Sequence, residues 1–159
     1  MRRQATGNAG MARERQRGLT LIEVMTVVAI LGIIAGIAWS AYDSQRLKGY
    51  RSDAVIALTT MAQREERYMT ENGSYTDNID KLDTDLDKKS PKLHYQLSVA
   101  IPGTTGCTVS VGGTNRYYCY VLTATAIAAQ AADTKCATLT LDQTGRRGAT
   151  GGGTDCWSK

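Results

Sequence analysis

The chain has 159 residues and a net charge of +4, with four cysteines and one histidine. This length suits one modest domain with an appendage. The net charge comes from the first eighteen residues, which carry five arginines and one glutamate, and the rest of the chain holds equal numbers of basic and acidic residues. Basic residues of this kind hold an N-terminus on the cytoplasmic side of a membrane. The positive balance therefore belongs to an N-terminal segment and gives no reason to predict a nucleic-acid-binding domain.

A long apolar run follows the basic segment. Residues 19–42 hold one ionisable side chain before the terminal tyrosine, that of Glu23. A helix over this run extends about 36 Å, enough to cross a hydrocarbon core of about 30 Å. Trp39 and the terminal tyrosine stand where an interfacial aromatic belt is expected. Gly32 and Gly36 either allow another helix to approach closely or reflect the frequency of glycine in membrane helices.

Glu23 is out of place in a simple membrane anchor. An ionised side chain in hydrocarbon costs on the order of 2.5 kcal/mol or more. The dipole of the first helical turn returns only about 0.3 to 1 kcal/mol. A buried carboxylate needs a cationic partner, and an amine on an adjacent helix would supply one. Glu23 is therefore the first candidate for a functional residue.

The helical pattern continues beyond the membrane segment. Residues 43–70 contain no proline, and apolar positions recur there at intervals of three and four against a charged face. Asn72 and Gly73 provide a stop signal. The sequence predicts one helix of about fifty residues. Its second half has an apolar stripe of Leu47, Tyr50, Ala54, Leu58, Met61, Ala62, Glu65 and Tyr68/Met69, and a charged face of Arg51, Asp53, Arg64, Glu66 and Arg67.

Residues 75–93 form a polar connector rich in aspartate. The run 83–87 resembles the start of a calcium-binding loop, but Lys88 stands where that loop requires glycine and His94 where it requires glutamate. A solvated loop is the favoured interpretation, with calcium binding as the alternative.

Four strands are expected after the connector, over 94–101, 107–111, 117–125 and 137–141, because these runs alternate or are rich in aromatic and β-branched residues. Glycine-rich turns separate them, and no helical pattern lies between them. An antiparallel meander is therefore predicted, with one face covering the apolar stripe of the helix.

All four cysteines lie in the C-terminal third and lack the close spacing of a zinc site, so two disulfides and an oxidising compartment are expected. Four cysteines permit three pairings. The sequential pairing, Cys107 with Cys119 and Cys136 with Cys156, is favoured because both loops are short.

Several motifs have two interpretations. Arg146 and Arg147 either form ordinary surface or contact acidic partners or DNA phosphates. The run Gly151–Gly153 lacks the context of a nucleotide-binding loop and is expected to be a flexible loop. His94 is expected to be structural or solvent-facing rather than catalytic. With no grouping of catalytic residues, the chain is predicted to be a non-enzyme without metal or cofactor.

The segment Arg17-Gly18-Leu19-Thr20-Leu21-Ile22-Glu23-Val24, followed by an apolar helix, resembles the processing site of type IV prepilins. The stretches 64–75 and 136–157 are similar to the PilE-type pilins, usually minor components of the fibre. The resemblance covers nearly the whole chain. Leu19 and Ser40 depart from the phenylalanine and proline usual at those positions, and the insertion with Cys107 and Cys119 is unusual.

The resemblance implies an α+β pilin fold, a lollipop-shaped subunit in which a long N-terminal helix packs on a small antiparallel sheet and the 136–156 disulfide closes a surface loop. It implies cleavage between Gly18 and Leu19 by a prepilin peptidase, which also methylates the Leu19 amine. Glu23 and Thr20 are the implied assembly residues, with Glu23 pairing with the Leu19 amine of a neighbouring subunit.

The implied organisation is a leader over 1–18, a transmembrane and assembly helix over 19–42, and a globular domain over 43–159. The subunit would wait in the inner membrane, then join other pilins in an extracellular fibre through an inner-membrane assembly platform. Such fibres serve adhesion, twitching motility or DNA uptake. The alternatives are a pseudopilin of a type II secretion system and a membrane-anchored binding module that never polymerises.

Overall fold

The computed structural model describes residues 18–82 and 88–157, apart from the side chain of Ser40. The chain divides into two compact units, residues 1–40 and 41–159, and helix α1 (Leu21–Asn72) contributes to both. The leader over 1–17 and the calcium-loop run over 83–87 lie outside the described residues.

In the first unit, α1 has no buried side chain among residues 21–39. Leu21, Ile33 and Ile37 are 78%, 68% and 70% exposed. The helix contains an 18-residue window with a mean hydropathy of 2.5, which makes it long and apolar enough to cross a membrane. No other described residue of this unit covers this apolar surface, and its contact with water is unfavourable. Its first half therefore requires lipid or other helices.

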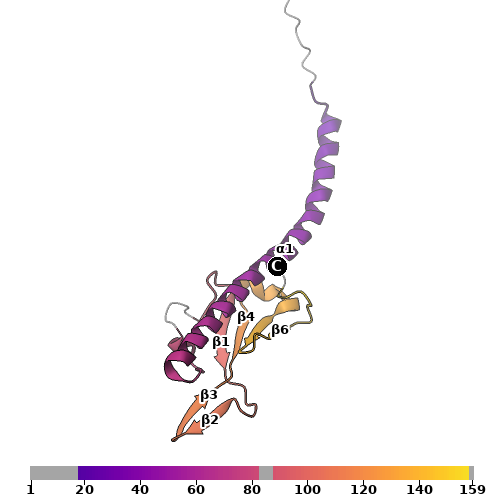
Figure 1. Ribbon diagram of the computed structural model, residues 1–159. Coiled ribbons are helices and arrows are strands. Elements are labelled where there is room, and N and C mark those ends of the chain that lie inside the picture. Colours follow the sequence, from indigo (N-terminus) through magenta and orange to yellow (C-terminus); the bar gives the residue numbers. More distant parts are fainter. Residues whose placement is uncertain (1–17, 83–87, 158–159) are drawn as a thin grey trace, which may run out of the picture. The chain divides into compact units, whose positions relative to one another are not determined.

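In the second unit, α1 packs against a four-stranded antiparallel sheet (Figure 1). The helix contributes Ala54, Ala57, Leu58 and Met61, whose spacing places them on one face. The sheet has the order β1-β4-β5-β6, and its strands are β1 (Tyr95–Ala100), β4 (Val121–Ala126), β5 (Thr138–Asp142) and β6 (Arg147–Thr150).

The register of the sheet explains its buried face. Leu97 pairs with Ala124, and Ala124 pairs with Leu139. Leu122 pairs with Leu141 in the same way. Alternate residues of a strand point to one face, so these five apolar side chains meet the helix. The α+β architecture expected from the sequence is confirmed, with its long helix, antiparallel sheet and disulfide-closed C-terminal loop.

The remaining strands form a separate two-stranded ribbon, β2 (Thr108–Val111) with β3 (Thr114–Tyr117). The ribbon lies beyond the end of the four-stranded sheet (Figure 1). Short 3-10 helices, η1 (Ile79–Lys81), η3 (Ala128–Ala132) and η4 (Thr134–Cys136), lie in the connections.

The predicted meander is wrong in two respects. The predicted strand over 117–125 is divided between the ribbon and the sheet, because Cys119 is bonded back to Cys107 at the point where the chain changes pairing partner. The strand β6 is missing from the prediction, since Arg147 and its neighbours show no apolar alternation.

Candidate functional site

The N-terminal candidate site lies at the start of α1. The Thr20 hydroxyl accepts a hydrogen bond from the backbone N–H of Glu23 at 3.3 Å, and the Thr20 carbonyl accepts from the same N–H at 3.1 Å. Thr20 therefore caps the helix, because its hydroxyl and its carbonyl both accept the backbone N–H of Glu23 in the first turn. Glu23 lies in the first turn, where the helix dipole favours a carboxylate, and is exposed. The Thr-x-x-Glu spacing is a capping-box signal that the sequence analysis missed.

The glycines of this unit have open space around them. A Cβ atom added at Gly18, Gly32 or Gly36 would meet nothing within 4 Å. The fold of the single chain therefore does not require glycine at any of these positions. A requirement for glycine there would have to come from another molecule.

In the second unit, a disulfide between Cys136 and Cys156 closes the C-terminal loop. Both cysteines are buried in the core cluster, with exposures of 0% and 2%. After Cys156, the Trp157 indole Nε1–H donates to the carbonyl of Gly148 in β6 at 2.7 Å. These links fix the end of the chain against the edge strand of the sheet.

The glycine run inside this loop is closely packed. A Cβ at Gly151 would lie 2.1 Å from the carbonyl oxygen of Thr134, and one at Gly153 would lie 2.7 Å from that of Lys135. The Gly153 N–H donates to the Lys135 carbonyl at 2.9 Å. The expectation of a flexible loop does not describe this segment, because glycine allows it to lie directly on the backbone of η4.

A buried ion pair holds this region on α1. The Arg51 guanidinium donates to both carboxylate oxygens of Asp133, at 2.7 and 2.9 Å, and both side chains are almost fully buried. This hydrogen bonding raises the pKa of Arg51 above its usual value. Gln130 donates to the carbonyl of Leu47 at 3.1 Å and to the Tyr95 hydroxyl at 3.0 Å. The sequence analysis missed this site, because the partners lie 82 residues apart.

The charged face predicted for the second half of α1 is also wrong at Arg51 and Asp53, which are buried. Asp53 accepts hydrogen bonds from the Ser90 hydroxyl and, at 3.1 Å, from the backbone N–H of Lys92. His94 stacks on Tyr50 with ring centroids 3.9 Å apart, as a structural residue would.

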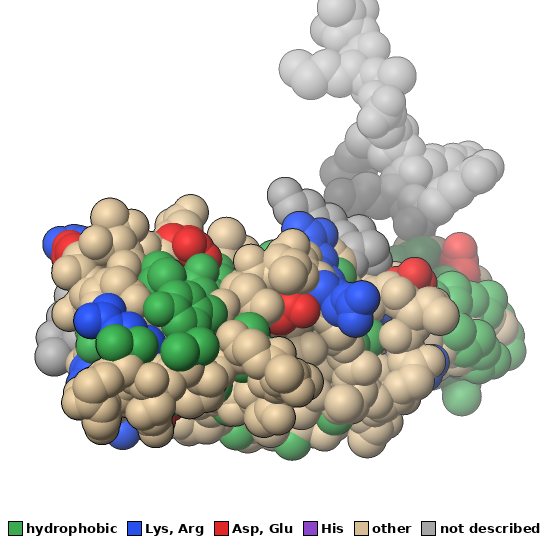
Figure 2. Space-filling view, turned by 60° about the horizontal axis from the view of Figure 1, so that its bottom comes forward, with side chains coloured by type: hydrophobic (Ala, Val, Ile, Leu, Met, Phe, Trp, Pro, Cys, Tyr) green, Lys and Arg blue, Asp and Glu red, His purple; other side chains and the backbone are tan. Residues whose placement is uncertain are grey.

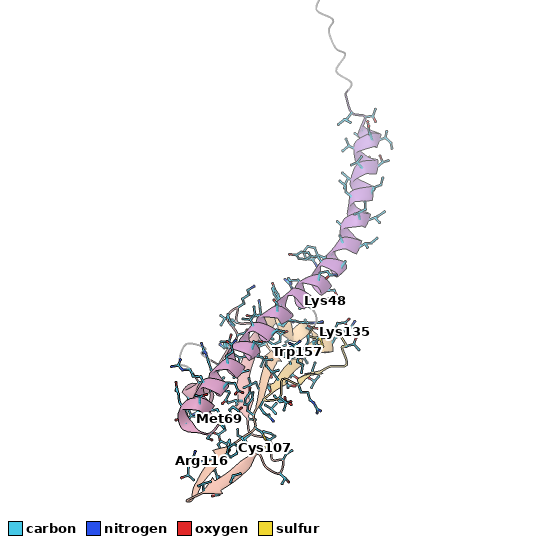
Figure 3. The ribbon with its side chains drawn as sticks, viewed as in Figure 1. Lys48, Met69, Cys107, Arg116, Lys135 and Trp157 are labelled. Atoms are coloured by element: carbon cyan, nitrogen blue, oxygen red, sulfur yellow. A yellow bond between two sulfur atoms is a disulfide. The ribbon has the colours of Figure 1, made fainter. Side chains whose placement is uncertain are left out.

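An open pocket lies between α1 and the C-terminal loop. Figure 3 places Lys48, Lys135 and Trp157 at this end of the second unit, with Cys107 and Arg116 at the other end. The Arg147 guanidinium lies 5.2 Å from the centroid of the Trp157 ring, in the range of a cation–π contact. The pocket is lined by Gln45, Lys48, Gly49, Arg51, Ser52, Val55, Ile56, Arg147, Asp155 and Trp157.

The ribbon is fixed at its base. The Cys107–Cys119 disulfide joins its two ends, and the Tyr118 N–H donates to the Cys107 carbonyl at 2.9 Å. Arg116 donates to the carbonyls of Asn72 and Gly73 at 3.4 and 3.3 Å, which satisfies acceptors at the C-terminus of α1. Over residues 18–82 and 88–157, no group of three or more histidine, cysteine, aspartate or glutamate side chains could hold a metal ion.

Comparison with known proteins agrees with this architecture. The profile of the prokaryotic N-terminal methylation motif matches residues 13–39. The profile of the family described as "Type IV minor pilin ComP, DNA uptake sequence receptor" matches residues 40–140. The long helix on an antiparallel sheet and the methylation motif define the class of type IV pilins. Within that class, the chain belongs to the type IV minor pilin ComP family.

Among similar proteins, the type IV major pilin protein PilE1 of Neisseria gonorrhoeae is 28% identical over 102 residues, which cover 64% of this chain and 57% of that protein. The type IV major pilin protein PilA of Myxococcus xanthus is 36% identical over 86 residues, covering 54% and 39%. The chain thus spans between about two fifths and three fifths of the length of these relatives.

The chain is also similar to a type II secretion protein and to a solved pilin structure. The type II secretion system core protein G of Pectobacterium carotovorum subsp. carotovorum is 32% identical over 66 residues, covering 42% of each protein. The structure of a type IV pilin from Shewanella oneidensis aligns with a TM-score of 0.47 and 28% identity, covering 71% of this chain and 99% of that one.

Proposed function

We propose that this protein is a minor subunit of a type IV pilus, without enzymatic activity of its own. The observation that carries the proposal is the fully exposed apolar half of α1, which begins at a capped turn containing one carboxylate. A chain that exposes so much apolar surface needs a second environment besides its own globular unit. Packing among the helices of other pilin subunits provides that environment.

A prepilin peptidase cleaves the chain between Gly18 and Leu19 and methylates the new amine. The open space around Gly18 supports this step, because the fold itself does not need glycine there. The cleaved chain waits in the inner membrane as a single-pass protein. The assembly platform then transfers it to the extracellular fibre, where Glu23 pairs with the Leu19 amine of a neighbouring subunit and offsets the cost of its burial.

The family description also leads us to propose that the subunit binds DNA during uptake. A pseudopilin role is the second candidate, since the type II secretion core protein G shares part of the sequence.

Replacement of Glu23 tests assembly. In the strain that produces the protein, Glu23→Ala should leave processing intact, with Leu19 as the first residue of the membrane-bound chain, but should reduce its amount in sheared surface fibres at least several-fold. N-terminal sequencing and immunoblots of the membrane and fibre fractions measure both quantities. Val24→Ala, an adjacent apolar position, is the control and should be incorporated normally. Normal incorporation of the Glu23 variant contradicts the pairing, and absence of the unaltered protein from fibres contradicts the pilus role.

A further inference from the structure

The proposed role in DNA uptake leaves open which residues contact DNA. Beyond residue 18 the chain has equal numbers of acidic and basic residues. On the face seen in Figure 2, the Lys and Arg side chains are scattered and interspersed with Asp and Glu. The face seen in Figure 2 therefore presents no broad basic surface to attract phosphates. The protein's contacts with DNA have to be concentrated where cations are held in place.

The pocket between α1 and the C-terminal loop is lined by two exposed cations, of which Arg147 is held by a contact with Trp157. Lys48 and Arg147 line it and are exposed, and they come from elements that the disulfide and the Arg51–Asp133 pair hold together. Arg51 also lines the pocket, but its charge is balanced by the two hydrogen bonds to Asp133. The attraction for an anion therefore rests on Lys48 and Arg147.

Arg147 is further prepared for binding by Trp157. The guanidinium lies over the indole ring, and the ring is itself fixed by its hydrogen bond to Gly148. An arginine held in this way loses less side-chain entropy when it binds a ligand. Its planar group can donate two parallel hydrogen bonds to a phosphate.

We propose that this pocket is a contact site for a phosphate of the DNA backbone, with Arg147 and Lys48 as its cationic groups and Trp157 as the platform for Arg147. The inference rests on the proposed DNA-binding function. Arg147 and Trp157 lie beyond residues 40–140, which the family profile matches, and Lys48 lies within them. Asp155 also lines the pocket and weakens its attraction for an anion.

The experiment uses the full chain in detergent with Trp39→Phe, which leaves Trp157 as the only tryptophan. A fluorescein-labelled 20-base-pair duplex of random sequence is the probe, because phosphate contacts do not depend on sequence. Binding is followed by anisotropy of the duplex and by the emission of Trp157. The two signals should saturate at the same duplex concentration. The leader arginines are identical in all variants, so a difference between two variants does not come from them.

Arg147→Ala should weaken binding several-fold and lower the slope of log affinity against log salt concentration by about 1. Arg146→Ala, the neighbouring arginine outside the pocket, is the matched control and should change both quantities less. Asp155→Asn should strengthen binding. The melting temperature of each variant shows whether it is folded.

Equal effects of the two arginine variants, or unchanged Trp157 emission with bound duplex, overturn the site while the DNA-binding function stands. Failure of the unaltered chain to bind the duplex overturns both. Weaker binding of the Asp155 variant also counts against the site, and it provides a test that does not depend on the Arg147 variant.

Discussion

At the scale of single residues, Glu65 is a carboxylate buried without a cationic partner among the described residues. Its side chain is fully buried near the end of α1. One carboxylate oxygen accepts a hydrogen bond from the backbone N–H of Thr76 at 3.1 Å, and the other has no hydrogen-bond partner among the described residues. Burial raises the pKa of Glu65 from about 4.5 to about 7, and the nearby charges of Glu66 and Asp77 act in the same direction.

This shift makes stability depend on pH. The folded chain keeps the Glu65 proton that the unfolded chain loses between pH 4.5 and 7. The free energy of unfolding therefore falls as the pH rises through this window, and the loss is complete above pH 7. Glu65→Gln should remove this component. Between pH 5 and pH 8 the unaltered protein should lose on the order of 2 kcal/mol more stability than the variant, measured by urea unfolding. An equal loss in both proteins would mean that Glu65 ionises freely.

The sequence placed Glu65 on the apolar stripe of α1 but did not indicate which other charges are buried. Arg51 and Asp53 do not stand at the positions of the apolar stripe, so periodicity alone assigns them to the solvent-exposed face of the helix. Their burial depends on Asp133 and Ser90, which come from distant parts of the chain. Local patterns contain no information about such partners.

At the scale of elements, the helix was the most predictable part of the fold and the edge strand the least. A prediction of about fifty helical residues compares with 52 in α1, because apolar spacing and the Asn72-Gly73 stop both act locally. The alternation predicts a strand over 137–141, and β5 (Thr138–Asp142) has these bounds within one residue at each end. Strand β6 is an edge strand that pairs only with β5, and its Gly148 lies against Thr140 of β5. The sequence of β6 shows no apolar face from which a strand could be predicted.

The glycine run after β6 provides a test of close packing. Gly151 and Gly152 both have positive φ, at 108° and 80°, but only Gly151 lies against the backbone of η4. Gly152→Ala should cost about 1 to 2 kcal/mol from backbone strain alone. Gly151→Ala should cost about 1 to 3 kcal/mol more, because its Cβ would overlap the Thr134 carbonyl. Thermal unfolding of both variants measures the difference. Equal destabilisation would show that the loop moves freely away from η4.

At the scale of the whole molecule, the two disulfides stabilise different parts of the second unit. They close loops with sequence separations of 12 and 20, for which chain entropy alone gives similar effects of about 3 kcal/mol. Cys136 and Cys156 also belong to the core cluster that joins α1 to the sheet, whereas Cys107 and Cys119 join the ends of the exposed ribbon.

We therefore expect the double variant Cys136→Ser with Cys156→Ser to lower the melting temperature more than Cys107→Ser with Cys119→Ser. The first replaces two buried sulfur atoms of the core cluster with hydroxyls, whereas the second replaces one buried sulfur atom outside that cluster, that of Cys107, and frees the ribbon. Circular dichroism under non-oxidising conditions measures both. The opposite order would mean that the ribbon contributes more to the stability of the second unit than the C-terminal loop does.

The exposure of residues 21–39 separates two kinds of constraint on the sequence. A substitution in the core of the second unit alters folding, and its effect appears in the isolated chain. A substitution in the first half of α1 changes no packing contact of its own unit and acts only through lipid or neighbouring subunits. Mutations that cause the same loss of fibres can thus be assigned to two classes by one measurement of melting temperature. A normal melting temperature identifies a defect between molecules rather than within one.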